Sequence, residues 1–351
     1  MPNSNYDVII IGAGLAGALV ARYLADGGMR VVVLEAKPAP GGTAHSSAIL
    51  SLLGTPEPYH TLETRWGHSS ALEIWDHSRE NLYHLEQILS ELGQKCRITG
   101  SIRPTAIRDE VKIWQNSATL LQEYGYDIEL ETASVYQYRA MILTFDDIVF
   151  NSKALIEGLL THPGIMVEYD CEVEAIKVRD TGEHAVWGYK RYIWGDRVVI
   201  ANGIHATRFE HTLNRFIKPR IIHSIETLDV PALAHPMILH HGNVNIIPTT
   251  DTWTITGWGT DIQQVLQLMI NTAEKLCPEA RVKTRQTMWV ATSQDGLPLI
   301  GSLPNSQNMY AINGLGPFGA SWVFVAAHQL AALILENKRP RLLDITRLSG
   351  L

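Results

Sequence analysis

The sequence predicts an α/β protein with a doubly wound parallel sheet, together with a second domain of the α+β type built on a mixed sheet. Three observations favour this fold class: an apolar run over residues 7–11 that ends in Gly12, a second over 31–34 that ends in Glu35, and a third over 197–201. Continuous apolar runs of this length are typical of strands that are buried on both faces of a parallel sheet.

The first run is followed by three glycines at the spacing of a dinucleotide-binding turn. Gly12 permits the tight turn off the strand, Gly14 lets the backbone approach a pyrophosphate, and Gly17 lets the next helix pack closely on the sheet. That helix, expected over residues 14–27, points its first N–H groups at the phosphates. Glu35 ends the second strand, where its carboxylate can accept hydrogen bonds from both ribose hydroxyls. An ordinary βαβ turn, the alternative, requires neither the three glycines nor the acid, so we expect a Rossmann-like dinucleotide site.

The composition bounds the class of protein. A length of 351 residues suggests about two domains, and a net charge of −7 gives no general affinity for nucleic acid or for an anionic membrane. No apolar stretch has the length of a membrane span. The three cysteines lie far apart, and His240 with His241 is favoured as a solvated pair, so no metal site is predicted. We therefore expect a cytoplasmic protein.

The rest of the chain alternates between helical and strand periodicity. Helices are expected over residues 62–92, 111–124, 151–160, 262–276 and 321–336. Strands are expected over residues 172–178, 185–193, 221–228, 237–240, 244–247, 253–256, 285–291 and 309–312. Because glycine-rich signals recur at Gly203 and Gly314, we expect the nucleotide domain to be discontinuous. We assign it residues 1–50, 145–220 and 286–351, and we assign the substrate domain residues 51–144 and 221–285.

The glycine motif alone does not separate FAD from NAD, but two other segments favour FAD. The stretch over residues 40–48 is rich in small side chains, and a bulky, flat ring system needs such close approach of the backbone. A second glycine-rich loop, Gly314–Ser321, leads into the last long helix. The N-terminus of that helix would stabilise the anionic edge of a reduced flavin.

These motifs together resemble the D-amino-acid oxidase-like family of FAD-dependent oxidoreductases, nearest to its glycine oxidase and sarcosine oxidase branches. The resemblance covers most of the chain in order, through residues 12–17 with Glu35, 42–46, Val173, 198–203, 295–301 and 314–321. It implies a discontinuous FAD-binding domain beside a mixed-sheet substrate domain. Met288 stands where the sarcosine branch carries its flavin-linking cysteine, so non-covalent FAD is expected.

The motif and the resemblance together imply a set of cofactor-binding residues. They are Gly12, Gly14, Leu15, Ala16, Gly17, Glu35, Ala36, Gly42, Thr43, Ala44, Ser47, Ala48, Ile49, Val173, Gly203, Gly296, Leu297, Gly314, Gly316, Pro317, Phe318, Gly319, Ala320 and Ser321.

The resemblance also implies a reaction. In the family, a C–N bond of an amine or amino acid is oxidised by hydride transfer to flavin N5, the imine hydrolyses in water, and O2 reoxidises the flavin in many members. The alternative is a flavin-dependent monooxygenase or hydroxylase that uses NAD(P)H; such enzymes usually carry a late Gly-Asp motif, whereas this chain has Asp295-Gly296. A flavin-binding module without catalysis is the third possibility. The expected partner is a small amine-type substrate, and no oligomeric state is predicted.

The sequence departs from the family where a substrate carboxylate would bind. Val290 stands at the position of the glycine oxidase arginine, and the basic positions of the sarcosine branch are occupied by Ile49, Leu52 and Ser321. Burying a carboxylate without a partner is costly. We therefore expect an amine, a cyclic imine-forming compound, or an amino acid held by a different cation. Arg220 is interpreted first as structural and second as that cation.

Aromatic side chains are the other candidates for the substrate pocket. Trp258, Trp289, Phe318 and Trp322 belong to segments that face the flavin in relatives, and His45 aligns with a histidine beside the flavin. An aromatic pocket would favour a planar, apolar or cationic substrate. Packing in the core explains each tryptophan equally well, and His45 could simply hydrogen-bond at a helix start. No residue is assigned a catalytic role.

Overall fold

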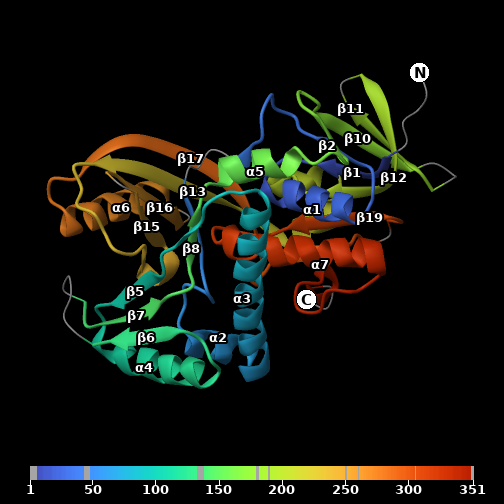
Figure 1. Cartoon of the computed structure of the whole chain (residues 1–351). Helices are drawn as coiled ribbons and strands as arrows, with labels where there is room; N and C mark the ends of the chain where they lie inside the picture. The colour runs from blue at the N-terminus through green and yellow to red at the C-terminus, as the bar shows by residue number, and fades with distance from the viewer. Residues whose placement is uncertain are drawn as a thin grey trace.

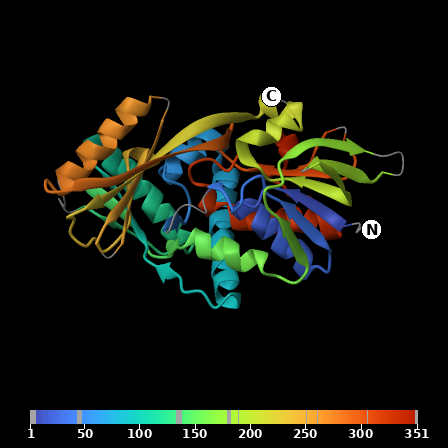
Figure 2. The same ribbon diagram turned by 90° about the horizontal axis from the view of Figure 1, so that it is seen from above.

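The computed structural model of the chain describes residues 6–42, 48–132, 138–178, 182–188, 190–249, 251–259, 261–304 and 306–348. Two large sheets lie at opposite ends of an elongated molecule, and helices pack against and between them (Figures 1 and 2). The predicted fold class is confirmed. The helices are α1 (Leu15–Asp26), α2 (Tyr59–Trp66), α3 (His68–Glu91), α4 (Arg108–Glu123), α5 (Ser152–Leu160), α6 (Ile262–Leu276) and α7 (Val323–Glu336).

The first sheet contains the nucleotide motif. Its strands follow the order β10-β11-β12-β1-β2-β9, and β12 also pairs with β19, which pairs with β18. The pairs β1–β2, β1–β12, β2–β9 and β12–β19 are parallel. The strands are β1 (Tyr6–Ile11), β2 (Val31–Leu34), β9 (Ile165–Glu168), β10 (Val173–Val178), β11 (His184–Gly188), β12 (Arg191–Ile200), β18 (Leu299–Ser302) and β19 (Met309–Asn313).

Both faces of the sheet are buried around β1 and β2, which explains the continuous apolar runs of these two strands. Val8 and Ile10 of β1 point into the core shared with α1 and α7. Ile9 and Ile11 point to the other face, where short 3-10 turns cover the sheet with side chains such as Leu213. The last four residues of β1, Val8 to Ile11, are therefore buried on both faces of the sheet, as a doubly wound sheet requires.

The second sheet is mixed and follows the order β17-β13-β16-β15-β14-β5-β7-β6. Helix α6 covers one face, where Met269 packs among Ile225 and Ile255. The opposite face of β13, β15, β16 and β17 is left for a cavity. The strands are β5 (Ser101–Thr105), β6 (Ile128–Glu131), β7 (Ala140–Thr144), β13 (Ile217–Leu228), β14 (Met237–Leu239), β15 (Val244–Pro248), β16 (Trp253–Gly259) and β17 (Arg281–Ser293).

A small sheet and the long helix α3 lie between the two large sheets (Figure 1). The small sheet has the order β3-β8-β4, with β3 (Ile49–Ser51), β8 (Ile148–Phe150) and β4 (Arg97–Ile98). The single helix predicted over residues 62–92 is two helices, α2 and α3. They are separated at Gly67, whose φ of 77° lies in the left-handed region that interrupts a right-handed helix.

Candidate active site

A cavity of about 1160 Å³ extends from the carboxyl ends of β1, β2 and β12 to the open face of the second sheet. Ligands bind at this edge of open α/β sheets. Gly14, Glu35 and Asn202 line the cavity beside the first sheet, and Ser224 and Trp258 line it on the second. One continuous space therefore joins a dinucleotide-binding edge to a separate sheet face.

The three glycines of the turn do different things. A Cβ on Gly17 would lie 1.9 Å from the carbonyl oxygen of Gly12, and a Cβ on Gly12 would lie 2.9 Å from the carbonyl oxygen of Ala201. These two glycines are needed for backbone packing. Gly14 differs, because no described atom beyond its two chain neighbours lies within 4 Å of its hypothetical Cβ. Gly14 is also the N-cap of α1, so the first turn of α1 faces the cavity over a residue without a side chain.

Glu35 is held in place by two backbone groups. It is 8% exposed. Its Oε2 accepts a hydrogen bond from the N–H of Ala13 at 2.9 Å, and its Oε1 accepts one from the N–H of Lys37 at 3.1 Å. Each carboxylate oxygen can accept a further hydrogen bond. Glu35 therefore fits a ribose that donates its hydroxyls from the cavity.

Asn202 is a second polar residue whose side chain a ligand in the cavity could hydrogen-bond. Its Oδ1 is buried and has no hydrogen-bond partner among the described residues, although the residue lines the cavity. A buried polar atom normally has a partner. Because the glycine turn, Glu35 and the Asn202 oxygen face one space, the residues present fit a bound dinucleotide.

The loop before α7 closes the cavity from the other end of the chain. Gly314 and Gly316 have φ values of 69° and 64°, and the N–H of Gly316 donates to the carbonyl of Ala291 at 2.8 Å. The loop then enters α7, whose N-terminus was expected to face the flavin. Two of its N–H groups, those of Phe324 and Val325, instead donate to Oδ1 of Asn81 on α3.

Asn81 is a residue that the sequence analysis missed. Its Nδ2 donates to the carbonyl of Ala320 at 3.0 Å and to Oγ of Ser51 at 3.1 Å. It is fully buried. A single amide therefore joins α3, the small sheet, the glycine-rich loop and the start of α7. No local pattern in the sequence of α3 indicates this role.

The open face of the second sheet carries rows of side chains across its strands. In the pairing of β17, β13 and β16, Ile222 lies between Met288 and Trp258, which makes an apolar row. The next row, two residues further along each strand, is polar and uncharged; it runs through Gln286, Ser224, Thr256 and Asn245. All of these residues line the cavity. Oδ1 of Asn245 is buried without a partner in the described part of the chain.

Two of the predicted aromatic residues meet at one turn. Nε1 of Trp258 donates to the carbonyl oxygen of Gly242 at 2.9 Å. A Cβ on Gly242 would lie 2.8 Å from Cζ of Phe318, so this ring packs on the same turn. Trp289 also lines the cavity but is 55% exposed. Trp322 is 4% exposed in the hydrophobic core and is absent from the described cavity lining.

The structure brings most of the predicted cofactor residues together. Those that line the cavity are Gly12, Gly14, Leu15, Ala16, Glu35, Ala36, Gly42, Ala48, Ile49, Val173, Gly203, Gly314, Gly316, Pro317, Phe318, Gly319 and Ala320. Thr43, Ala44, His45 and Ser47 lie outside the described residues. Lys37, Asn202 and Arg208 also line the cavity and were not predicted.

Four predicted cofactor residues are absent from the described lining: Gly17, Gly296, Leu297 and Ser321. Gly17 packs against Gly12, as described above. Oγ of Ser321 accepts a hydrogen bond from the N–H of Leu52. Leu297 is buried in the core, and the neighbouring Asp295 forms a two-point ion pair with Arg347, with distances of 2.8 and 3.0 Å. The Asp-Gly-Leu segment thus fastens the C-terminal 3-10 turn (Ile345–Leu348).

The structure shows where the residues lie that replace the family's basic carboxylate-binding residues. Val290, Ile49 and Leu52 line the cavity. Among the described cavity residues of β13, β15, β16 and β17, the ionised side chain is Glu226, and its Oε1 lies 3.2 Å from Nζ of Lys283. Burial raises the pKa of the Cys171 thiol, which also lines the cavity, so this cysteine stays protonated at neutral pH.

Every helix in the described ranges falls short of the combined length and hydropathy that crossing a membrane requires.

The glycine turn, the acid at the second strand and the two-sheet cavity define a dinucleotide-binding oxidoreductase. Residues 7–333 match the family described as FAD dependent oxidoreductase, and the chain belongs to this family. Its cofactor is FAD, as predicted. No match was found among curated protein sequences.

Solved structures share the fold over nearly the whole chain. Glycine oxidase from Bacillus cereus ATCC 14579 is 18% identical with a TM-score of 0.78, covering 96% of this chain and 96% of its own. L-proline dehydrogenase from P. horikoshii is 17% identical with a TM-score of 0.80, covering 97% and 96%. L-amino acid deaminase from Proteus vulgaris, without its specific insertion sequence, is 16% identical with a TM-score of 0.78, covering 99% and 95%.

Proposed function

We propose that this protein oxidises a C–N bond of an amine or amino acid, with hydride transfer to flavin N5, hydrolysis of the imine in water and reoxidation of the flavin by O2. The observation that carries the proposal is the single cavity that joins the dinucleotide edge of the first sheet to the open face of the second. The solved structures of similar fold include an oxidase, a dehydrogenase and a deaminase of amino acids, which supports a substrate with a C–N bond.

FAD supplies the hydride acceptor, and the chain supplies binding and orientation. Gly12 and Gly14 would admit the pyrophosphate, and Glu35 would accept hydrogen bonds from the ribose. The loop Gly314–Phe318 would hold the ring system against the cavity. With Met288 at the cysteine position of the sarcosine branch, we propose that FAD is bound without a covalent link.

The second sheet would orient the substrate by uncharged hydrogen bonds. The row through Gln286, Ser224, Thr256 and Asn245 offers hydroxyl and amide groups, and the adjacent row through Ile222 and Trp258 offers apolar contact. A desolvated ammonium group releases its proton more readily, because burial disfavours the charged form. The substrate amine would therefore bind neutral, ready to lose a hydride from the adjacent carbon.

We further propose that the preferred substrate is an amine without a carboxylate on the reacting carbon. The described cavity residues of the second sheet include neither lysine nor arginine, and an arginine–carboxylate pair is the strong, two-point interaction that such a carboxylate usually requires. Arg220 lies two residues before Ile222 on β13 and therefore projects on the same face of the sheet, but it is absent from the described cavity lining. It is the alternative cation for binding a substrate carboxylate.

We propose that the nucleotide domain consists of residues 1–50, 145–220 and 286–351, and that the substrate domain consists of residues 51–144 and 221–285. The strands of the first sheet all fall within the former set, which supports the division. Strands β13 and β17 cross the proposed boundaries and so connect the two domains directly.

The test is a visible spectrum of the purified protein followed by an anaerobic screen for flavin bleaching. Each amine is tested beside the amino acid that carries the same side chain. We expect bleaching by amines, and faster bleaching by the amine of each pair. Oxidation of NADPH by the protein, or a bound flavin that no amine or amino acid reduces, would overturn the proposal.

A further inference from the structure

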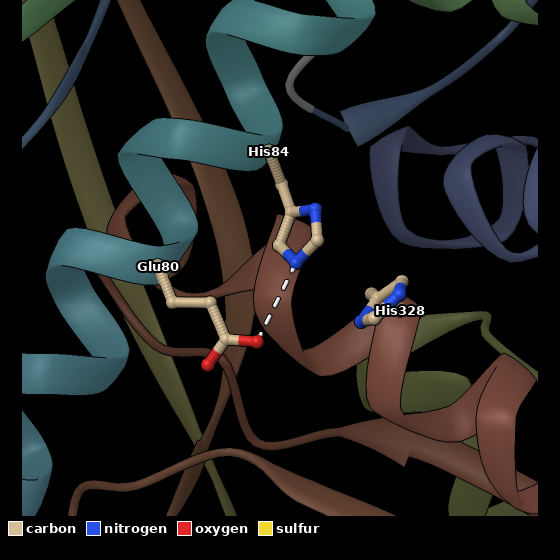
Figure 3. A group of neighbouring side chains, drawn as sticks. All are labelled: Glu80, His84 and His328. Carbon is tan, nitrogen blue, oxygen red and sulfur yellow. Dashed lines mark ion pairs between the residues drawn. The ribbon is translucent and has the colours of Figure 1, made fainter.

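Two helices that face each other bring together a carboxylate and two imidazoles away from the FAD cavity. Glu80 and His84 lie on α3, and His328 lies on α7. Figure 3 shows the three side chains pointing toward one another across the helix interface. One ligand atom from each residue lies within 4.8 Å of the other two. Nε2 of His84 lies 3.5 Å from Oε1 of Glu80, and the two imidazole ring centroids are 4.2 Å apart.

We propose that Glu80, His84 and His328 bind one divalent transition-metal ion, preferably zinc, which cross-links α3 to α7. Two imidazole nitrogens and one carboxylate oxygen are a donor set that zinc uses, with water in the fourth position. Glu80 and His84 are four residues apart, so they share one face of α3. Ligands of a tetrahedral ion lie about 3.3 Å apart when the bonds are about 2.0 Å, so rotamer adjustments of about an ångström would close the site.

The histidine nitrogens provide an independent reason. Nε2 of His84 and Nδ1 of His328 are both buried, and neither has a hydrogen-bond partner among the described residues. The ring of Tyr23 packs edge-on against both imidazoles, at centroid distances of 6.2 and 5.4 Å, and its hydroxyl is likewise buried without a described partner. Buried polar atoms left unpaired are costly, whereas a metal ion would use an imidazole lone pair.

The cluster is accessible to ions. A small cavity of about 290 Å³ lies beside it, lined by Glu73, His77 and Glu80 from α3 and by His328 and Gln329 from α7. Lys338, Arg339 and Arg341 line the same cavity. These three cations are exposed, so water and salt screen their repulsion of a metal ion. The space also leaves room for a water ligand.

The location gives the ion a structural consequence. His84 lies three residues after Asn81 on α3, and His328 lies four residues after Phe324 on α7. Asn81 binds the N–H of Phe324, so the metal would fasten the same two helices one turn further along. Ion binding would then support the start of α7 and the loop Gly314–Ser321 that borders the FAD cavity.

The experiment uses the FAD-loaded protein after treatment with a chelator and dialysis. Zinc is titrated against a chromophoric chelator, cobalt is titrated while its absorption between 550 and 700 nm is recorded, beyond the flavin bands, and unfolding is followed by tryptophan fluorescence. We expect one zinc per chain, a tetrahedral cobalt spectrum, and a rise in the unfolding temperature with zinc.

The variants locate the ion. His328→Gln and Glu80→Gln should each weaken zinc binding at least tenfold and abolish the thermal shift. His77→Gln is the matched control, because His77 lines the same small cavity but its Nδ1 bonds the carbonyl of Glu73; this variant should bind zinc like the wild type. Glu80 has a 42% exposed side chain, so its variant keeps the test valid if His328→Gln does not fold.

Three outcomes would overturn the proposal. The first is the absence of stoichiometric zinc binding. The second is equal zinc binding by wild type, His328→Gln and Glu80→Gln. The third is stabilisation of the wild type by inorganic phosphate but not by zinc, which would make the small cavity an anion site of Lys338, Arg339 and Arg341.

Discussion

Arg220 lies directly opposite Val290 in the antiparallel pairing of β13 with β17. Directly opposed residues project on the same face of a sheet, with Cβ atoms about 5 Å apart. The chain therefore has an arginine one strand away from the position where the glycine oxidase branch has its own. Lys218 occupies the same face two residues earlier.

Kinetics of an Arg220 variant would distinguish an amine substrate from an amino-acid substrate. If the substrate lacks a carboxylate, Arg220→Met should leave kcat/KM for the amine within about twofold, because no charged contact is lost. Gln286→Leu and Thr256→Val should each lower it about tenfold, the equivalent of one lost hydrogen bond of about 1.4 kcal/mol. Lys218→Met is the matched control for charge. A rise in KM for amino acids alone in Arg220→Met would instead identify Arg220 as the carboxylate anchor.

A change from glycine to alanine should have opposite effects at two positions of the glycine turn, Gly17 and Gly14. Gly17→Ala should destabilise the apoprotein by about 1–3 kcal/mol or more, because the new methyl group meets the carbonyl of Gly12 at 1.9 Å. Gly14→Ala should cost the apoprotein less than about 1 kcal/mol but weaken FAD binding at least tenfold, since its methyl group projects into the space for the pyrophosphate. Urea unfolding of apoprotein and quenching of FAD fluorescence measure the two effects. Equal FAD affinity in Gly14→Ala and wild type would contradict the assignment.

Glu35 should determine whether the protein retains FAD. Glu35→Arg removes the acceptor of the N–H groups of Ala13 and Lys37, which is also the acceptor that we propose for the ribose hydroxyls. Each charged hydrogen bond contributes about 1.5–3 kcal/mol, so we expect at least a tenfold loss of FAD affinity. Flavin content per chain after gel filtration measures it. Glu129→Arg, an exposed residue on β6, makes the same charge change far from the cavity and should keep its flavin.

The Asp295–Arg347 pair predicts a dependence of stability on pH. Burial opposes ionisation of Asp295, but the hydrogen bonds and charge of Arg347 prevail and hold its pKa below the usual 3.8. Because the folded pKa is the lower one, the stabilisation is complete above pH 4 and is lost as the pH falls through the folded pKa. Asp295→Asn should lose about 2 kcal/mol in free energy of unfolding at pH 7, and the difference from wild type should shrink below pH 4.

Urea unfolding from pH 7 to pH 2 checks this, with Asp229→Asn as the control. Asp229 pairs with Arg281, but that pair is exposed, so its loss should cost less than about 1 kcal/mol. A constant difference between Asp295→Asn and wild type across the whole range would show that the ion pair is not the source of the effect.

Asn81 should matter for the flavin environment as well as for stability. Asn81→Ala leaves the N–H groups of Phe324 and Val325 without their acceptor, at about 1–3 kcal/mol each in a buried setting, while the carbonyl of Ala320 still accepts from Oγ of Ser51. Asn81→Asp keeps the acceptor but replaces the Nδ2 donor by an oxygen that faces the carbonyl of Ala320, so it should be destabilised as well. We expect a blurred or shifted flavin absorption band in Asn81→Ala. An unchanged spectrum together with unchanged stability would argue against this role.

The N-terminal half of the first sheet could be predicted closely because its signals are local. Apolar runs buried on both faces, three glycines and an acid each follow from the residues themselves. β5 was missed because Arg103 and Pro104 lie within it. Arg103 is buried only because Nη2 donates to the carbonyl of Leu53 and the guanidinium lies 3.9 Å from Asp147. Those partners come from elsewhere in the chain.

The substrate side of the site was predicted less well for a similar reason. Ser224 and Gln286 belong to one polar row only because of the register in which β13 pairs with β17, and this register cannot be read from the sequence. Trp322 resembled a pocket residue by its position after the loop, but the turn into α7 directs it into the core. His84 and His328 lie far apart in sequence, so no ligand spacing could indicate their meeting.

The flavin cavity is completed by segments from distant parts of the sequence, the turn at Gly12–Gly14 and the loop at Gly314–Phe318. On a translating ribosome, the first βαβ unit is available to fold long before the loop has been made. By the proposed assignment, that unit would bind the pyrophosphate, but it lacks the loop that would hold the isoalloxazine ring. We therefore expect capture of FAD to be a late event in biogenesis, after both sheets have left the ribosome.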